Sequence, residues 1–121
     1  MRNQDDILIV EDEAIVALDL EYTLESLGWR VVASLSGVDQ ALAWLRGQER
    51  PPAAALLDVN LGGQRVFPVA HALTDRKAPF VFVTGYADVV ANSAFAGAPT
   101  LTKPVDPERL QTVLRGLVGH P

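Results

Sequence analysis

The sequence predicts an α/β protein in which a parallel sheet is covered by helices on both faces. Short apolar runs alternate with longer segments of helical periodicity, and this order is kept along the whole 121-residue chain. The apolar runs are largely unbroken, which is typical of strands that are buried on both faces. We therefore expect five strand–helix units in a three-layer, doubly wound (βα)5 arrangement.

The first half of the chain predicts two complete units and a third strand. Apolar residues recur at helical spacing before Gly28, which is expected to end the first helix. Ser36 is expected to cap a second helix that ends at Gly47. The expected elements are, in order, strand 7–10, helix 14–27, strand 30–34, a helix that starts after Ser36, and strand 53–57.

The second half predicts the remaining helices and strands. Pro68 suits the first turn of the third helix, and the pair Asp106-Pro107 suits the start of the last one. The fourth helix is short and contains indifferent helix formers, so we expect it to be the most labile. The expected elements are helix 67–73, strand 80–83, helix 88–95, strand 99–101 and a last helix from residue 107.

Length and composition narrow the class of protein. A chain of this length can build one core, so we expect a single domain over residues 1–121. A net charge of -5 and scattered basic residues weigh against direct binding to nucleic acid or to an anionic membrane, and no apolar run is long enough to span a bilayer. With no cysteine and no signal-peptide pattern at its acidic start, the chain is expected to be cytoplasmic and without disulfides.

Residues that serve phosphoryl-transfer chemistry follow four of the predicted strands. Glu11 and Asp12 follow the first strand, Asp58 closes the third, Thr84 the fourth, and Lys103 follows the fifth. Because parallel strands end at the same edge of a sheet, these side chains are expected to converge on one crevice, where open α/β sheets bind ligands. Three carboxylates that are forced together repel one another unless they take up protons or a hard cation neutralises them.

Mg²⁺ is the cation that this set of residues favours, because it prefers one or two carboxylates and shares its other positions with water and phosphate oxygens. Zinc is not expected, since the chain has no cysteine and both His71 and His120 are distant in sequence from the strand ends. The ion would bridge an incoming phosphoryl group to Asp58, leaving Asp58 to attack phosphorus and form an acyl phosphate.

Other residues near the predicted crevice suit the phosphoryl oxygens. Lys103 offers a mobile positive charge, Thr84 a hydroxyl donor, and Gly85 a backbone N–H that no side chain obstructs. The Lys103-Pro104 bond can be cis or trans on the sequence alone.

These residues belong to four motifs that together resemble the receiver domain of two-component response regulators, including the chemotaxis regulators, over essentially the whole chain. The motifs are Val10-Glu11-Asp12-Glu13, Leu57-Asp58, Val83-Thr84-Gly85 and Thr102-Lys103-Pro104. The resemblance implies a flavodoxin-like fold of sheet order 2-1-3-4-5, and phosphorylation of Asp58 by a phosphohistidine on a sensor histidine kinase or histidine phosphotransfer protein. It also implies Mg²⁺ bound by Asp12, Asp58 and the backbone carbonyl of Asn60, with Glu11 acting through water.

The chain departs from this family at one position. The aromatic residue that usually stands three positions before the lysine, and turns inward on activation, is replaced by Thr100. The run from Pro79 to Tyr86 is similar to the Phe-Ala-Thr-Gly signature of a subgroup of receivers that lack this aromatic, many of them single-domain proteins, although Val83 replaces the alanine. We expect Tyr86 and the weak fourth helix to take over the reporting of phosphorylation.

The predicted function is that of a phosphoacceptor receiver, which promotes only its own phosphorylation and dephosphorylation and is otherwise no enzyme. Without an attached effector domain, its output would be altered binding of an unidentified downstream protein, at the face of the fourth helix, fifth strand and fifth helix, or service as a phosphate sink. Phosphorylation could also drive formation of a homodimer.

Two alternatives stay open. One is an Mg-dependent phosphatase with an aspartyl-phosphate intermediate, although such enzymes usually need a second aspartate where this chain has Asn60. The other is a pseudo-receiver that binds partners without phosphorylation, against which intact Asp58, Thr84 and Lys103 argue. Each motif taken singly also has a structural explanation, as a helix cap or a turn.

Overall fold

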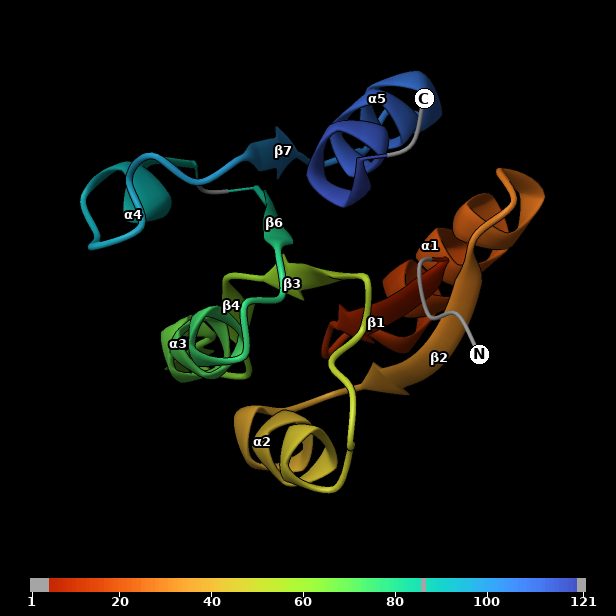
Figure 1. The fold of residues 1–121 in the computed structure, drawn as a ribbon. Helices are drawn as coiled ribbons and strands as arrows, with labels where there is room; N and C mark the ends of the chain where they lie inside the picture. Colours follow the sequence, from red (N-terminus) through yellow and green to blue (C-terminus); the bar gives the residue numbers. More distant parts are fainter. Residues whose placement is uncertain (1–4, 86, 120–121) are drawn as a thin grey trace.

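The computed structural model describes residues 5–85 and 87–119 and confirms the predicted α/β fold (Figure 1). Five parallel strands form one sheet in the order β2-β1-β3-β6-β7, which is the predicted order 2-1-3-4-5 once the two hairpin strands β4 and β5 are set aside. The strands of the sheet are β1 (Asp6–Val10), β2 (Arg30–Leu35), β3 (Ala54–Asp58), β6 (Phe80–Thr84) and β7 (Thr100–Thr102). The helices are α1 (Ala14–Ser26), α2 (Val38–Arg46), α3 (Phe67–Asp75), α4 (Ala87–Ala91) and α5 (Pro107–Val118).

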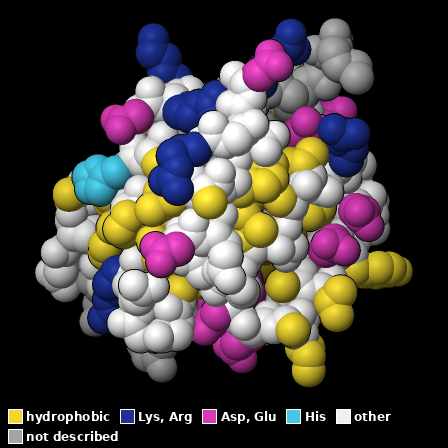
Figure 2. Space-filling model, turned by 90° about the horizontal axis from the view of Figure 1, so that it is seen from below, with side chains coloured by type: hydrophobic (Ala, Val, Ile, Leu, Met, Phe, Trp, Pro, Cys, Tyr) yellow, Lys and Arg dark blue, Asp and Glu magenta, His cyan; other side chains and the backbone are white. Residues whose placement is uncertain are grey.

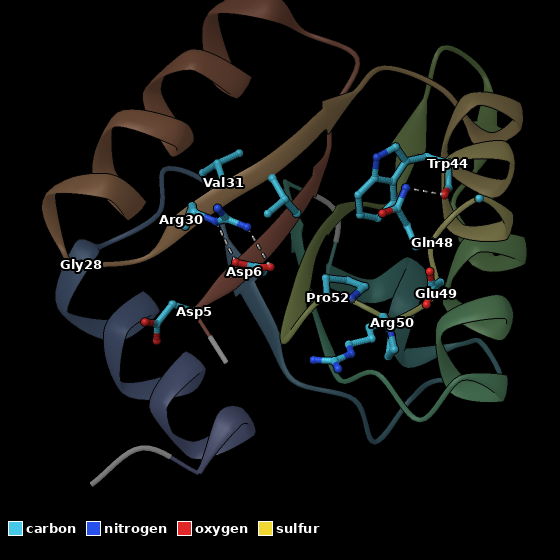
Figure 3. Close-up of a pocket in the computed structure, with 13 residues that line it drawn as sticks. Asp5, Asp6, Gly28, Arg30, Val31, Trp44, Gln48, Glu49, Arg50 and Pro52 are labelled. Atoms are coloured by element: carbon cyan, nitrogen blue, oxygen red, sulfur yellow. Dashed lines mark hydrogen bonds and ion pairs between the residues drawn. The ribbon is translucent and has the colours of Figure 1, made fainter. Parts of the chain in front are cut away.

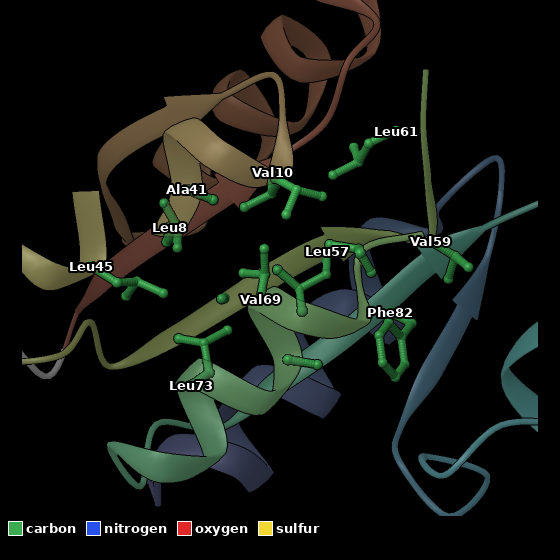
Figure 4. Packing of buried hydrophobic residues seen from close by; sticks show 14 of the residues in the cluster. Leu8, Val10, Ala41, Leu45, Leu57, Val59, Leu61, Val69, Leu73 and Phe82 are labelled. Atoms are coloured by element: carbon green, nitrogen blue, oxygen red, sulfur yellow. The ribbon is translucent and has the colours of Figure 1, made fainter. Parts of the chain in front are cut away.

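The sheet is the middle of three layers, because successive residues of its strands point to opposite faces. Leu8 and Val10 of β1 join an apolar cluster that contains residues of α2 and α3, whereas Ile7 and Ile9 join one that contains residues of α1 and α5. All four side chains are at most 1% exposed, as expected for a strand that is covered on both faces. Figure 4 shows the first cluster, between the sheet and helices α2 and α3.

Most of the predicted helix ends are confirmed. Gly28 has φ of 99°, a left-handed conformation that glycine adopts without strain, and it stands directly after the C-cap residue of α1. Asp106 caps α5, because its Oδ1 accepts a hydrogen bond from the backbone N–H of Glu108 at 3.3 Å. Pro68 lies in the first turn of α3.

The predicted capping role of Ser36 is wrong. Helix α2 begins at Val38, so the N-cap position falls on Gly37, and no side chain caps this end of the helix. Ser36 lies one residue too early for its hydroxyl to take the capping role at the N-cap position.

Helix α4 is shorter than the predicted helix 88–95, since it spans only Ala87–Ala91. The hydroxyl of Ser93 donates to the carbonyl of Val90 at 2.7 Å and accepts from the backbone N–H of Phe95 at 3.0 Å. Such local bonds between a side chain and the backbone compete with the helical pattern, which explains why the chain leaves the helix here.

A short antiparallel hairpin, β4 (Asn60–Leu61) with β5 (Gln64–Arg65), was not predicted beyond a loop at Gly62-Gly63. Both glycines have positive φ, 56° and 92°, which is the conformation that a two-residue hairpin turn requires. Within the described ranges, the structure contains no helix of the length and apolar character needed to cross a membrane.

Candidate functional site

The register of the sheet brings the predicted site residues to one edge. Three register pairs do this: Val10 with Leu57, Asp58 with Val83, and Thr84 with Thr102. Glu11, Asp58, Thr84 and Lys103 therefore stand at the carboxyl ends of four neighbouring strands. This is the edge at which doubly wound sheets bind ligands.

Lys103 joins the ends of β1 and β3. Its Nζ lies 2.9 Å from Oε1 of Glu11 and 3.5 Å from Oδ2 of Asp58. The side chains of Glu11 and Asp58 are 1% and 8% exposed, whereas that of Lys103 is 24% exposed. One ammonium group at the surface therefore faces two buried carboxylates.

The environment of Glu11 disfavours its charged form. Burial raises the pKa of Glu11, and hydrogen bonding and charge from Asp58 raise it further. The hydrogen bonds from Lys103 and from the backbone N–H of Glu13, the latter 3.1 Å long, act in the opposite direction but do not cancel the effect of burial. The pKa of Glu11 therefore lies above its usual value.

Lys103 is held in its charged form. Burial lowers the pKa of Lys103, but the hydrogen bond to Glu11 and the negative charges of Asp58 and Glu11 outweigh that effect and raise it. This cation therefore faces the carboxylate of Asp58.

Asp12 stands at the mouth of the site and is tied to the hairpin that follows β3. Its Oδ2 accepts a hydrogen bond from the backbone N–H of Gly62 at 3.0 Å. A Cβ at Gly62 would lie 4.0 Å from the same oxygen, so the turn passes close to this carboxylate. The sequence does not predict this contact, although the pair Gly62-Gly63 indicates a turn at this place.

The remaining predicted residues lie around the two buried carboxylates. Thr84 is 1% exposed at the end of β6, and its carbonyl accepts a hydrogen bond from the backbone N–H of Lys103 at 2.9 Å. Gly85 is exposed, with no atom within 4 Å of the place where a Cβ would stand, so a ligand has room to approach its backbone. The Lys103-Pro104 bond is cis. The role of the Asn60 carbonyl stays a prediction; Asn60 is exposed beside Asp58, and its backbone N–H donates to Oδ1 of Asp58 at 3.3 Å.

The donor set fits a hard divalent cation. Oxygen atoms of Glu11, Asp12 and Glu13 lie within 4.8 Å of one another. Buried Asp58 adds a further carboxylate beside Glu11, and Lys103 is the cation that pairs with both. Carboxylate oxygens without sulfur or imidazole are the donors that Mg²⁺ prefers. Glu13, which belongs to this cluster, was not among the predicted ligands.

Hollows lie at both ends of the strands of the sheet. One of about 370 Å³ lies beside the site and is lined by residues that include Glu11, Asp12, Ala14, Leu18 and Gln40. A larger one of about 1010 Å³ lies at the opposite, amino-terminal ends of the strands, where Asp6 pairs with Arg30 near Trp44 and Pro52 (Figure 3). It shares no lining residue with the site.

A parallel β2-β1-β3-β6-β7 sheet with buried acids and a lysine at its carboxyl edge defines the class of response regulator receivers. The family model for the response regulator receiver domain matches residues 7–115, and the chain belongs to this family.

Among solved structures, the chain is similar to SdrG from Sphingomonas melonis Fr1. The two are 41% identical, the comparison covers 98% of this chain and 99% of SdrG, and the TM-score is 0.82. A structure of SdrG in its BeF3-activated conformation is 40% identical, with a TM-score of 0.80.

Two curated relatives are longer proteins. The chain is 33% identical over 114 residues to the sensory transduction protein LytT of Bacillus subtilis, and 28% identical over 112 residues to the phyllosphere-induced regulator PhyR of Methylorubrum extorquens. These comparisons cover 90% of this chain but only 46% of LytT and 42% of PhyR. The chain thus spans less than half the length of both relatives.

Proposed function

We propose that this receiver accepts a phosphoryl group on Asp58 from the phosphohistidine of a sensor kinase or phosphotransfer protein. The observation that carries the proposal is the ammonium of Lys103 held between buried Glu11 and Asp58. An oxygen of Asp58 forms a bond to phosphorus as the phosphorus–nitrogen bond of the donor breaks, and the histidine nitrogen keeps the electron pair. The products are an acyl phosphate and an unphosphorylated histidine.

The charges around Asp58 suit this transfer. A phosphoryl group brings negative oxygens to a place that already holds two carboxylates, so the reaction needs positive charge there. Lys103 supplies one positive charge, and the buried hydroxyl of Thr84 and the backbone N–H of Gly85 would donate hydrogen bonds to the same group. Mg²⁺ held by Glu11, Asp12, Asp58 and the Asn60 carbonyl would supply the remaining neutralisation.

The similarity to SdrG supports a receiver whose conformation responds to its occupied site. SdrG is known in a BeF3-activated conformation, and the fluoroberyllate group is a tetrahedral mimic of a phosphoryl group. With 40% identity over 98% of the chain, a comparable response is expected here.

The surface next to the site suits a helical donor protein. Ile15, Leu18 and Tyr22 are 83%, 64% and 75% exposed, and their spacing places them on one stripe of α1. Figure 2 shows apolar side chains that project at the edge of the molecule where Figure 1 places α1, with acidic side chains beside them.

The stripe lies next to the site, and helix α1 is acidic. Both observations favour one kind of binding partner for this stripe. Leu18 lines the same hollow as Glu11 and Asp12, so a protein that delivers a phosphoryl group to Asp58 would also cover the stripe. Helix α1 carries Asp19, Glu21 and Glu25 and no basic residue. Its expected partner is therefore an amphipathic helix with lysine or arginine beside its apolar face, rather than a second copy of this acidic surface.

The test is the intact mass of the protein after incubation with acetyl phosphate and Mg²⁺. We expect wild type to gain one phosphoryl mass and Asp58→Asn to gain none, with Asp19→Asn as a control that still gains it. A wild-type protein that stays unmodified would overturn the proposal and favour a pseudo-receiver. Repeated turnover of p-nitrophenyl phosphate would instead favour a phosphatase.

A further inference from the structure

The four phenylalanines of the chain meet in one aromatic cluster on the α3 side of the sheet. Phe67 belongs to α3, Phe80 and Phe82 belong to β6, and Phe95 lies in the connection between α4 and β7. The ring of Phe95 contacts all the others: its centroid lies 5.7 Å from that of Phe67, 5.7 Å from that of Phe80 and 5.9 Å from that of Phe82. The imidazole of His71, an exposed residue of α3, lies 4.8 Å from the ring of Phe95.

Phe95 differs from the other three rings in what holds it. Phe67, Phe80 and Phe82 belong to a helix and to a central strand of the sheet. Phe95 follows a helix of only five residues, and its backbone hydrogen bonds are local. Its N–H donates to the Ser93 hydroxyl, and its carbonyl accepts from the N–H of Ala98 at 2.9 Å. Its ring is thus an anchor of the 92–99 connection to α3 and β6.

The same strand leads from this cluster to the site. Because side chains alternate along a strand, Phe80, Phe82 and Thr84 point to the same face of β6. Thr84 stands two residues beyond Phe82, which corresponds to about 7 Å along the strand. This shared face of β6 is the route by which a movement of the Thr84 side chain would reach Phe82, and the Phe82 ring lies 5.9 Å from that of Phe95.

The register also shows what replaces the aromatic that is usual at position 100. Thr100 pairs directly with Phe82, and its hydroxyl donates to the carbonyl of Ala98 at 3.3 Å. Three rings pack against Phe82: those of Phe67 and Phe80, at 5.8 Å and 5.3 Å, belong to α3 and β6, whereas that of Phe95, at 5.9 Å, belongs to the connection that leads to Thr100. Tyr86, the reporter expected from the sequence, lies outside the described residues.

We propose that Phe95 is the residue that reports phosphorylation of Asp58, because its ring transmits a change at Thr84 to the 87–99 segment. The inference rests on the proposed phosphorylation of Asp58. It names a different residue, on a different element, from the strand aromatic that is usual in the family.

The test uses protein in which 4-fluorophenylalanine replaces all four phenylalanines, with each ¹⁹F signal assigned from a single Phe→Leu variant. Acetyl phosphate and Mg²⁺ are added, and the ¹⁹F spectrum and the intact mass are recorded on the same sample. We expect the Phe95 signal to shift by more than its linewidth and by more than the Phe80 signal. Asp58→Asn under the same conditions controls for effects of Mg²⁺ alone and should show no such shift.

A second variant tests the route. Thr84→Val keeps the shape of the side chain but removes a hydroxyl that would bind the phosphoryl group, so phosphorylation of Asp58 should be slower. Compared with wild type at the same phosphorylated fraction, read from the intact mass, the Phe95 signal of this variant should no longer shift. A matched pair, Phe95→Leu and Phe80→Leu, removes one ring each from the cluster. Only Phe95→Leu should abolish the phosphorylation-induced amide shifts of residues 87–99.

The outcomes separate the two proposals. A gain of phosphoryl mass with an unmoved Phe95 signal would overturn the role of Phe95 and leave the proposed function intact. A Phe95 signal that shifts equally in wild type and in Thr84→Val would overturn the proposal that the change passes through Thr84. Absence of the mass gain would overturn the proposed function and this inference together.

Discussion

The ammonium group of Lys103 lies 2.9 Å from Oε1 of Glu11, although 92 positions separate the two residues in the sequence. The contact links the end of β1 to the residue that follows β7, and Asp58 of β3 lies between these strands in the sheet. One lysine thus connects the acidic residues with the far edge of the site.

Mg²⁺ should stabilise the folded protein. A ligand that binds only the native state raises the free energy of unfolding by about 2.7 kcal/mol at a hundredfold excess over its Kd. We expect a corresponding rise in the thermal midpoint on addition of MgCl2, measured by circular dichroism, and a clearly smaller rise in Asp12→Asn. Asp19→Asn, an acid-to-amide change on the exposed face of α1, should respond like wild type. An equal response in all three proteins would contradict the predicted site.

Removal of the Lys103 charge should separate metal binding from phosphorylation. In Lys103→Met, the cation that competes with Mg²⁺ for Glu11 and Asp58 is lost, so Mg²⁺ should bind several-fold more tightly in a calorimetric titration. The metal-free variant should be less stable by about 1–2 kcal/mol, a modest value because the lysine is partly exposed. Phosphorylation by acetyl phosphate should be slower by on the order of tenfold to a hundredfold.

Lys77→Met is the matched control for that variant. Lys77 is exposed and precedes the amino-terminal end of β6, opposite the edge that holds the site. The Mg²⁺ affinity, the stability and the rate of phosphorylation should therefore stay at their wild-type values. Weaker Mg²⁺ binding by Lys103→Met would show that the lysine does not compete with the ion.

The raised pKa of Glu11 predicts a pH-dependent difference between wild type and Glu11→Gln. A carboxyl group whose pKa is higher in the folded than in the unfolded state binds more protons when folded, so its contribution to stability falls as the pH rises through these two values. In metal-free buffer, wild type should therefore lose stability relative to Glu11→Gln as the pH increases from the usual pKa of glutamic acid towards neutrality. Urea denaturation of both proteins at several pH values measures the difference, and a constant or oppositely changing difference would be inconsistent with the raised pKa.

The exposed stripe of α1 predicts a difference between protein and small-molecule donors. Leu18→Asp should slow phosphorylation by a sensor kinase that phosphorylates wild type by about tenfold or more, because it removes an apolar contact and adds a charge to the interface. Phosphorylation by acetyl phosphate should be unchanged, since that donor does not need the stripe. Thr112→Asp introduces a charge at an exposed position on α5 and serves as the control. Equal rates with the kinase in all three proteins would exclude the stripe as the docking surface.

The sequence was sufficient to predict the five strands of the parallel sheet and the edge of the sheet at which the site lies. Unbroken apolar runs such as Ile7–Val10 are buried on both faces, and the residue that follows such a run in a parallel sheet has a defined place. This reasoning predicted that Glu11, Asp58, Thr84 and Lys103 would converge, and the structure places them together. Their chemical roles stay predictions for the experiments above.

Features that depend on tertiary contacts were not visible in the sequence. The bond between Asp12 and Gly62 joins two loops, and the ion pair of Lys103 with Glu11 joins two strand ends, so neither follows from local patterns.

The ends of two helices were also misplaced, for local reasons. Helix α4 ends earlier than predicted, because the hydroxyl of Ser93 forms hydrogen bonds with the backbone of Val90 and Phe95. Ser36 was predicted as the cap one residue too early, because the helix begins at Val38 and the N-cap is Gly37. Helix ends cannot be placed to within one residue from the sequence pattern.

The hairpin turn at Gly62 holds one oxygen of Asp12 by a main-chain amide, so an acid from the first loop is steered by the loop that leaves the acceptor strand. A protein that binds this turn from outside would shift the position of that oxygen without contacting Asp58. The affinity for the metal ion, and with it the rate of phosphorylation, would then depend on whether a protein is bound at this turn.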